Sequence, residues 1–194
     1  GGRSSGRETI GRVAAGAVAA KILRELGVEV CAYTLSIGPV SINRDLFDFE
    51  EIQNNALFMP DAAAAKEASA YLEKCMSEKN SAGGMIECKI TGVPAGIGEP
   101  VFEKLNANLG KAILSIGAVK SFEIGDGIRV ASSDGLHNND AYRMDNEGNV
   151  WKKTNHSGGI TGGLSDGTPI IIRAAFKPTP SIASIQESVT RSGD

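Results

Sequence analysis

The sequence predicts an α+β fold, a sandwich with helices packed inside it. A helix expected over residues 5–26 carries glycine and alanine beside its apolar stripe, which is typical of a helix buried between two layers. Two strand patterns, 119–124 and 128–131, follow each other with no helix between them, which favours paired strands. Helix–strand alternation taken alone would instead favour a parallel α/β sheet, so these two observations decide the prediction.

The first half of the chain divides into elements by its capping residues and its hydrophobic periodicity. Ser5 is a helix cap and Gly27 a natural stop, so the first helix lies between them. A strand is expected over 28–37, and Pro60 opens a second helix. Residues 85–90 alternate as a strand, with Ile86, Cys88 and Ile90 on one side and Glu87 and Lys89 on the other.

The second half begins with a helix from about residue 101. A polar stretch rich in Gly and Asn follows over 132–163, and we expect a long functional or mobile loop there, with a hairpin turn at 145–148. A continuous apolar run then predicts a last strand over 168–176. The apolar stripe of the helix consists of Leu105, Leu109, Ala112, Ile113 and Ile116.

Length and composition bound the class of protein. The chain has 194 residues and a mass of 20.2 kDa, which fits a single domain over 1–194. A net charge of -3 argues against nucleic acid as the main partner. The three cysteines form no metal pattern, no apolar run approaches the ~20 residues that span a bilayer, and no signal peptide is found. These features predict a cytoplasmic protein with reduced thiols and no membrane partner.

The first candidate site is the stretch from Gly1 to Arg7, a glycine-rich loop that leads into a helix N-terminus. Free backbone N–H groups and the helix dipole attract an anion there. The hydroxyls of Ser4 and Ser5 and the guanidiniums of Arg3 and Arg7 add strong donors. The residues alone leave two interpretations open, an anion site or an ordinary capped helix with solvated arginines.

Two further segments are weaker candidates. Residues 155–163 contain paired glycines that would let a ligand lie against the backbone, although a flexible turn explains them equally simply. Residues 177–181, Lys-Pro-Thr-Pro-Ser, would present a cation and two hydroxyls from a rigid turn. A strand exit with a solvated lysine is the simpler interpretation of the second segment when it is taken alone.

The histidines and the loop acids give no catalytic set. His137 and His156 have no partner at triad or metal spacing, so neither is assigned as a base and both are expected to face solvent. We expect turn chemistry to explain most of the acidic residues beside Gly or Asn. These acids are Asp126, Asp134, Asp140 and Asp166.

Taken together, these segments resemble the chorismate synthase family. Residues 2–9, GRSSGRET, and 12–17, RVAAGA, are similar to that family's GRSSARET and RVAAGA signature, with Gly6 in place of Ala. Residues 92–102, GVPAGIGEPVF, are similar to its GVPAGLGEPVF segment. The agreement continues through the rest of the chain.

Three later segments extend the resemblance. Residues 115–120 and 123–127 are similar to SINAVK and EIGDG, with Gly117 where many members carry Asn. Residues 156–163 and 177–181 match the family's GGI-x-GG and KPT-x-[ST] segments. Five ordered motifs make chance agreement implausible. The match runs from Gly1 to about Ile182 and is less distinctive over 45–78.

The resemblance implies a carbon–oxygen lyase that converts 5-enolpyruvylshikimate 3-phosphate to chorismate and phosphate by a 1,4-anti elimination. It implies reduced FMN as cofactor, NADPH as a candidate reductant, and a homotetramer. The implied fold is a β-α-β sandwich with helices packed between antiparallel sheets. Arg7 becomes the candidate for a phosphate or carboxylate of the substrate. FMN binding is implied for Arg3, Ser4, Ser5, Gly117, Ala118, Gly162, Lys177, Pro178, Thr179, Pro180 and Ser181.

Several functional segments of the family have no counterpart in this sequence. Its two functional histidines lie in FGESHG and RPGHAD segments before the GRSS motif, as does an arginine pair, and an acidic GRHDP segment follows later. The chain starts inside the motif at Gly1 and stops in a polar tail, which predicts that part of the working protein lies beyond both ends. No catalytic residue is therefore assigned, and these residues alone are expected to show little or no turnover and weakened FMN affinity.

Overall fold

A computed structural model describes residues 2–193, so Gly1 of the glycine-rich motif lies outside the described part. The chain divides into two compact units, which are described in turn. Unit 1 contains the residues up to Tyr33 together with Met85–Phe176, and unit 2 contains Thr34–Gly84 together with the residues from Lys177 onward.

Unit 1 is built on a sheet of long strands. The strands lie in the order β1 (Glu29–Ile37), β3 (Gly84–Thr91), β9 (Ile170–Phe176) and β4 (Val119–Ile124), and the second half of β1 continues into unit 2. β4 pairs with β9 antiparallel, with Phe122 opposite Ala174. Antiparallel pairing combined with helices confirms the predicted α+β class over a parallel α/β sheet.

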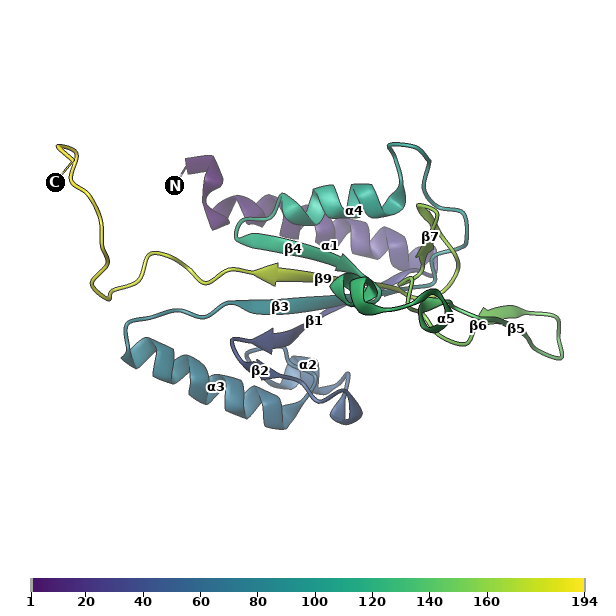
Figure 1. Ribbon diagram of the computed structural model, residues 1–194, viewed down its shortest axis with the longest axis horizontal. Helices are drawn as coiled ribbons and strands as arrows, with labels where there is room; N and C mark the ends of the chain where they lie inside the picture. The colour runs from purple at the N-terminus through teal and green to yellow at the C-terminus, as the bar shows by residue number, and fades with distance from the viewer. Residues whose placement is uncertain (1, 194) are drawn as a thin grey trace. The chain divides into compact units, whose positions relative to one another are not determined.

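Helix α4 (Leu105–Leu114) covers this sheet and closes the core of unit 1 (Figure 1). Its predicted stripe packs on the strands, because Leu105, Leu109 and Ile113 contact the buried cluster of Ile160, Ile170 and Ile172. Gly110 lets the helix approach closely, since a Cβ there would lie 3.3 Å from the Phe122 ring. The apolar periodicity thus predicted this interface.

The start of α4 differs from the prediction. The helix was expected from about residue 101 but begins at Leu105. Glu99 and Glu103 instead form an isolated antiparallel bridge, with a 2.9 Å bond from the N–H of Glu99 to the carbonyl of Glu103. This bond closes a turn before the helix, so the residues between cannot join it.

Helix α1 (Thr9–Glu25) is exposed, and the prediction that it is buried between two layers is wrong for the described residues. None of its residues is buried, and Ile10 is 77% exposed. Leu26, just after the helix, is 71% exposed, and Gly27 ends the element with a φ of +77° as predicted. Small residues show that a helix can accept close neighbours, but they do not supply the layer that covers it.

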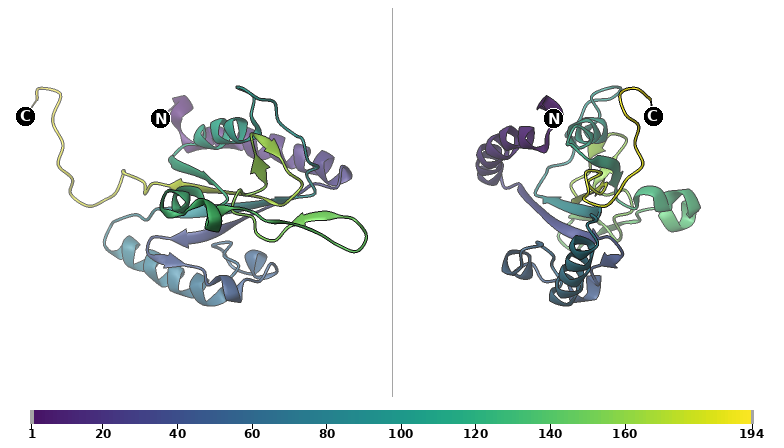
Figure 2. Two further views of the ribbon diagram at one scale, coloured as in Figure 1. Left: turned by 45° about the vertical axis from the view of Figure 1, so that its right-hand side comes forward. Right: turned by 90° about the vertical axis from the view of Figure 1, so that its left-hand side faces the viewer.

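The long polar stretch of unit 1 is more ordered than a loop. Gly127–Ser132 is a 3-10 helix rather than the short strand expected at 128–131, and the four-residue helix α5 covers Gly135–Asn138. The predicted hairpin forms between β5 (Tyr142–Met144) and β6 (Val150–Lys152) and projects from unit 1 in Figure 1 and in the left view of Figure 2. A second, shorter hairpin joins β7 (Ile160–Thr161) to β8 (Leu164–Ser165).

Unit 2 contains the predicted second helix. β2 (Val40–Ser41) pairs antiparallel with the end of β1, the short helix α2 covers Glu51–Asn54, and α3 covers Ala62–Ser77. Asp61 caps α3 because its carboxylate accepts from two backbone N–H groups of the first turn. The buried residues of α3 are Ala64, Ala65, Ala68 and Cys75.

The cysteines are unpaired, as expected of reduced thiols. Cys75 is buried, and Cys31 and Cys88 are partly buried. Burial, helped by negative charge nearby, raises the pKa of the Cys88 thiol to about 11, so this thiol stays protonated at neutral pH. Within residues 2–193, no helix has both the length and the hydropathy that crossing a membrane requires.

Candidate functional site

A polar cavity of about 370 Å³ in unit 1 joins two segments that the sequence analysis singled out. One wall comes from the turns before α1 and its first residues, and the other from the end of α4 and the turn after it. The residues are thus more than 100 positions apart along the chain. The cavity is lined by Arg3, Ser4, Ser5, Glu8, Thr9, Arg12, Leu114, Ser115, Ile116 and Gly117.

The first wall is built from two short turns that precede a long helix. Gly2–Ser4 and Gly6–Glu8 are single 3-10 turns, and Gly2 adopts a φ of +53°, which glycine tolerates without strain. The hydroxyl of Ser5 accepts from the N–H of Arg7 at 3.5 Å. The 17-residue helix that follows points its positive end toward this wall, which favours a negative group.

The second wall is a tight turn with an unusual backbone. Val119 donates its N–H to the carbonyl of Ile116 at 3.3 Å, and Ala118 adopts a φ of +70°. A residue with a Cβ pays roughly 1–2 kcal/mol for this conformation. Strained backbone of this kind is concentrated at functional sites, and here it lies beside the predicted flavin-binding residue Gly117.

The sequence analysis missed the role of Arg12, which joins the two walls. Its Nη2 donates to the carbonyl of Ser115 at 3.1 Å and to the hydroxyl of Ser115 at 3.0 Å. The Ser115 hydroxyl in turn donates to the carbonyl of Ala112 at 2.6 Å. Arg12 was placed only within the RVAAGA motif, because nothing in that motif reveals a partner 103 residues away.

The charges of the cavity suit an anion. Arg3 and Arg12 contribute two guanidinium groups, against the single carboxylate of Glu8. Guanidinium groups bind phosphate and carboxylate through paired hydrogen bonds, and the hydroxyls of Ser4 and Ser5 add donors. The arrangement can therefore hold a phosphorylated or carboxylated ligand, and it contains no histidine among its lining residues.

Three predicted residues of unit 1, Ala118, Arg7 and Gly162, lie outside the lining of this cavity, and Ala118 directly follows the lining residue Gly117. Arg7 belongs to the turn Gly6–Glu8 and is exposed. Gly162 lies in the turn between β7 and β8 with a φ of +65°. That hairpin is tied to the beginning of α4, because Leu105 donates its N–H to the carbonyl of Gly163 at 2.8 Å, whereas the cavity lies at the end of α4.

The segment Lys177–Ser181 belongs to unit 2 and is exposed. Within that unit, the hydroxyl of Ser81 donates to the carbonyl of Thr179 at 2.7 Å. The carbonyl of Pro180 accepts from the side chain of Gln186 at 3.1 Å. The segment is thus anchored through its backbone, and the side chains of Lys177, Thr179 and Ser181 remain exposed. Their approach to the cavity of unit 1 stays a prediction.

A buried ionic cluster lies behind the polar loop, and turn chemistry does not explain it. The side chain of Lys152 is only 4% exposed and bonds Asp166 at 2.6 Å, with Asp140 at 3.7 Å. Lys152 also donates to the hydroxyl of Ser157 at 3.0 Å. Burial alone would raise the pKa of Asp166, but the bond from Lys152 and those from nearby hydroxyls hold it below its usual value.

Both histidines have acidic partners that the sequence spacing did not reveal. The Nδ1 of His156 lies 2.7 Å from Asp126, with the imidazole 29% exposed, so the expectation that it faces solvent without a partner is wrong. His137 pairs with Asp134 at 2.7 Å and is well exposed. The first pair spans 30 residues and forms only because two turns meet, since Asp126 also donates its N–H to the carbonyl of His156.

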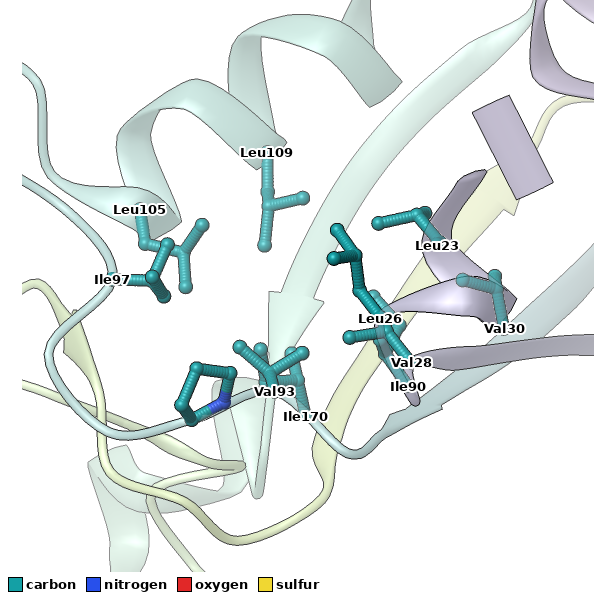
Figure 3. A pocket seen from close by; sticks show the side chains of 11 residues that line it. Leu23, Leu26, Val28, Val30, Ile90, Val93, Ile97, Leu105, Leu109 and Ile170 are labelled. Atoms are coloured by element: carbon teal, nitrogen blue, oxygen red, sulfur yellow. The ribbon is translucent and has the colours of Figure 1, made fainter. Parts of the chain in front are cut away.

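An apolar cavity of about 480 Å³ lies elsewhere in unit 1 (Figure 3). Leu23 and Leu26 from the end of α1 face Leu105 and Leu109 of α4 across it. All of its lining side chains are hydrophobic, so it offers no group that would hold an anion.

The fold and the polar cavity define an α+β protein with a cationic cleft suited to a phosphorylated or carboxylated ligand. The comparisons narrow this class to one family. The family model described as chorismate synthase matches residues 1–194, and the chain therefore belongs to the chorismate synthase family.

Individual relatives agree with this assignment. Chorismate synthases of Agathobacter rectalis and Lachnoclostridium phytofermentans are 62% and 60% identical to this chain over 194 residues. A crystal structure of a chorismate synthase superposes with a TM-score of 0.84 at 29% identity, covering 90% of this chain and 57% of that one. Each match to the two bacterial enzymes covers 100% of this chain and 53% of the relative, so the chain spans about half their length.

Proposed function

We propose that this chain carries part of the cofactor and substrate site of a chorismate synthase. The reaction is the 1,4-anti elimination of phosphate from 5-enolpyruvylshikimate 3-phosphate, which yields chorismate. One observation carries the proposal: the GRSS turn before α1 and the turn at Gly117 line one cationic cavity, although they lie far apart along the chain. Both segments belong to the motifs that resemble the family's flavin-binding residues.

The donor set of the cavity fits the phosphate end of FMN. Arg3 with the hydroxyls of Ser4 and Ser5 would hold the charged group. Gly117 in the lining, and Ala118 next to it, would meet the cofactor through their backbone. Gly162 and the segment Lys177, Pro178, Thr179, Pro180 and Ser181 complete the proposed set. When bound, reduced FMN supplies transient electron donation that eases loss of the allylic phosphate, without net redox change.

The residues of this chain act mainly through charge. The substrate and the reduced flavin are both anionic, so placing them together requires fixed positive groups. Arg7, exposed beside the cavity wall, is the proposed contact for a phosphate or carboxylate of the substrate. Arg3 and the positive end of α1 lower the cost of bringing the two anions together. Such preorganised charge is usually the largest catalytic contribution.

A second candidate function is FMN binding without turnover. It is favoured by the absence of any histidine among the residues that line the cavity, while both histidines of the chain are bonded to aspartates elsewhere. On this view the chain by itself is a cofactor-binding scaffold or an inert one. We also propose a cytoplasmic location and a homotetrameric assembly, with NADPH as candidate reductant.

Anaerobic titration separates these functions. The chain is titrated with reduced and with oxidised FMN, and chorismate formation is then followed by absorbance after 5-enolpyruvylshikimate 3-phosphate is added. We expect weak FMN binding and little or no chorismate. Tight binding with robust turnover would support the full activity and contradict the expectation of weak activity, whereas no FMN binding in either redox state would contradict the proposed site.

A further inference from the structure

We propose that Arg12 is a positioning residue that holds the turn at residues 116–118 against the first turns of α1. This inference rests on the proposed function, because the two segments that Arg12 joins are the walls of the proposed flavin site. Arg12 itself lies in the first turn of α1 and lines the same cavity as Arg3. Its task is to keep the two walls at the spacing that the phosphorylated ligand needs.

The contact made by Arg12 is specific in geometry. One nitrogen, Nη2, donates to both the carbonyl and the hydroxyl of Ser115, at 3.1 Å and 3.0 Å. Ser115 is the residue that ends α4, where helix carbonyls lack partners within the helix. A cation at this end also interacts favourably with the helix dipole. Arg12 therefore gives the Ser115 carbonyl a hydrogen-bond donor and also places a positive charge at the negative end of the α4 dipole.

Little else fixes the distance between the two walls. α1 contributes no buried side chain, so apolar packing does not hold its first turns in place. Within residues 2–193, the Arg12 bonds are the side-chain hydrogen bonds that link α1 to the end of α4. The guanidinium remains exposed and lines the cavity, so its loss would loosen the site without opening the core of unit 1.

The geometry ranks the possible replacements. Arg12→Lys keeps the charge but loses the planar fork, so it should restore part of the function. Arg12→Met keeps a long helix-forming side chain and removes both bonds. Ser115→Ala removes the hydroxyl and leaves the carbonyl acceptor. Arg24→Met is a matched control, because Arg24 lies in the last turn of the same helix, is exposed and does not line the cavity.

FMN affinity, measured by flavin fluorescence quenching, tests the proposal. We expect a loss of about 10-fold or more for Arg12→Met, a smaller loss for Arg12→Lys and for Ser115→Ala, and no change for Arg24→Met. The double variant Arg12→Met with Ser115→Ala should bind no worse than Arg12→Met alone, because both changes remove one interaction. Thermal midpoints should stay close to that of the unmodified chain, which excludes a general loss of stability.

A second measurement keeps this inference separate from the proposed function. Amide hydrogen exchange of residues 116–119, in the absence of ligand, should be faster in Arg12→Met than in Arg24→Met. Unchanged exchange, or fully additive losses of FMN affinity in the double variant, would overturn the role of Arg12. Failure of the unmodified chain to bind FMN, with the exchange difference intact, would instead contradict the proposed function and leave the tie between the walls standing.

Discussion

Two adjacent residues, Gly117 and Ala118, show how the turn after α4 is adapted at the level of single side chains. The left-handed conformation belongs to Ala118, although glycine would adopt it without strain. Gly117, in contrast, has open space where its Cβ would be, with nothing within 4 Å. The backbone strain of the turn therefore lies at Ala118, and the open space lies at Gly117, which lines the cavity.

Gly117→Asn tests this spare room. The resemblance places Asn at this position in many members of the family, and the open surroundings allow the side chain to be built without moving a neighbour. We expect FMN to bind about 3–10-fold more tightly, the gain of one hydrogen bond of about 1 kcal/mol. Fluorescence titration measures it, with Gly117→Ala as control. An Asn variant that binds no better than the Ala variant would contradict the expectation.

Single residues also mark the limit of what the sequence predicts. Arg3, Ser4, Ser5 and Gly117 were predicted from motifs, and the structure brings them to one cavity. Arg12 was not predicted as a contact, because its partner is 103 residues away and no local spacing reports such a pair. Motifs describe chemistry along the chain, whereas these bonds depend on how distant elements fold together.

Among the elements, the polar stretch between residues 132 and 163 owes its order to Asp140. Its carboxylate accepts from the hydroxyl of Thr154 and the N–H of His156, each at 2.7 Å, and from the N–H of Ser157 at 2.9 Å. Burial by itself would raise the pKa of Asp140, but these bonds outweigh it and hold the pKa well below the usual range. One carboxylate thus organises a turn that lacks regular structure.

Asp140→Asn should lower the free energy of unfolding by an amount that depends on pH. Because the pKa of Asp140 is lower in the folded than in the unfolded chain, where it is about 3.9, the carboxylate stabilises the fold above that value and stops doing so as the pH falls. We expect a loss of about 2–4 kcal/mol at pH 7, because the amide of Asn would place an N–H donor against the N–H and O–H donors around it. The difference should shrink steadily as the pH falls below about 4.

The measurement is urea unfolding followed by fluorescence of Trp151, the single tryptophan of the chain, which lies in the adjoining strand β6. Glu147→Gln is the control, because it removes an exposed carboxylate from the same hairpin. Equal effects of the two substitutions at pH 7, or an Asp140→Asn effect that persists unchanged at low pH, would contradict the assignment.

The elements differ in how well their pattern predicted them. The strands β3 and β9 and the helix α4 have a clear period and were found within a few residues, because one face of each packs on the core of unit 1. The 3-10 helix Gly127–Ser132 was mistaken for a strand, since a short apolar run fits both periods. The exposure of α1 could not be predicted, because it depends on whether another layer covers the helix and not on the residues of the helix itself.

At the scale of the whole molecule, a charged network crosses the sheet of unit 1. Glu87 in β3 is only 1% exposed, although it was grouped with Lys89 on the polar side of the strand. It accepts from the hydroxyl of Tyr33 in β1 and from the Nε of Arg173 in β9 at 2.6 Å. Arg173 also donates to the carbonyl of Gly125 at 2.5 Å, so the network ties strands to the turn after β4.

Glu87→Gln should therefore weaken unit 1 more than an ordinary surface change. It leaves the partly buried guanidinium of Arg173 without its closest opposite charge, and we expect a loss of about 2–4 kcal/mol in the free energy of unfolding. Replacing the pair together, Glu87→Leu with Arg173→Leu, should recover part of that loss, because neither ion of the pair is left behind, although Glu123 then loses its contact with Arg173 at 3.8 Å. Urea unfolding measures both, and a double variant as unstable as one with Glu87 alone replaced would refute this account.

The fold class was predictable because it depends on the order and period of elements, which the chain records locally. The division into two units was not, since it arises where β1 passes from one unit into the other and the chain returns through β3. Likewise Glu87 and Arg173 lie 86 residues apart, so alternation along β3 gave no sign that the polar side of that strand is also buried.

The bare surface of α1 has a thermodynamic consequence for how this chain behaves in concentrated salt. Ile10, Val13, Val18 and Ile22 all meet water over more than half of their area. Sulfate is excluded from protein surfaces and makes each such contact with water more costly. Raising the sulfate concentration therefore favours adsorption of the chain to a hydrophobic matrix. Retention on a phenyl column should grow steeply with ammonium sulfate.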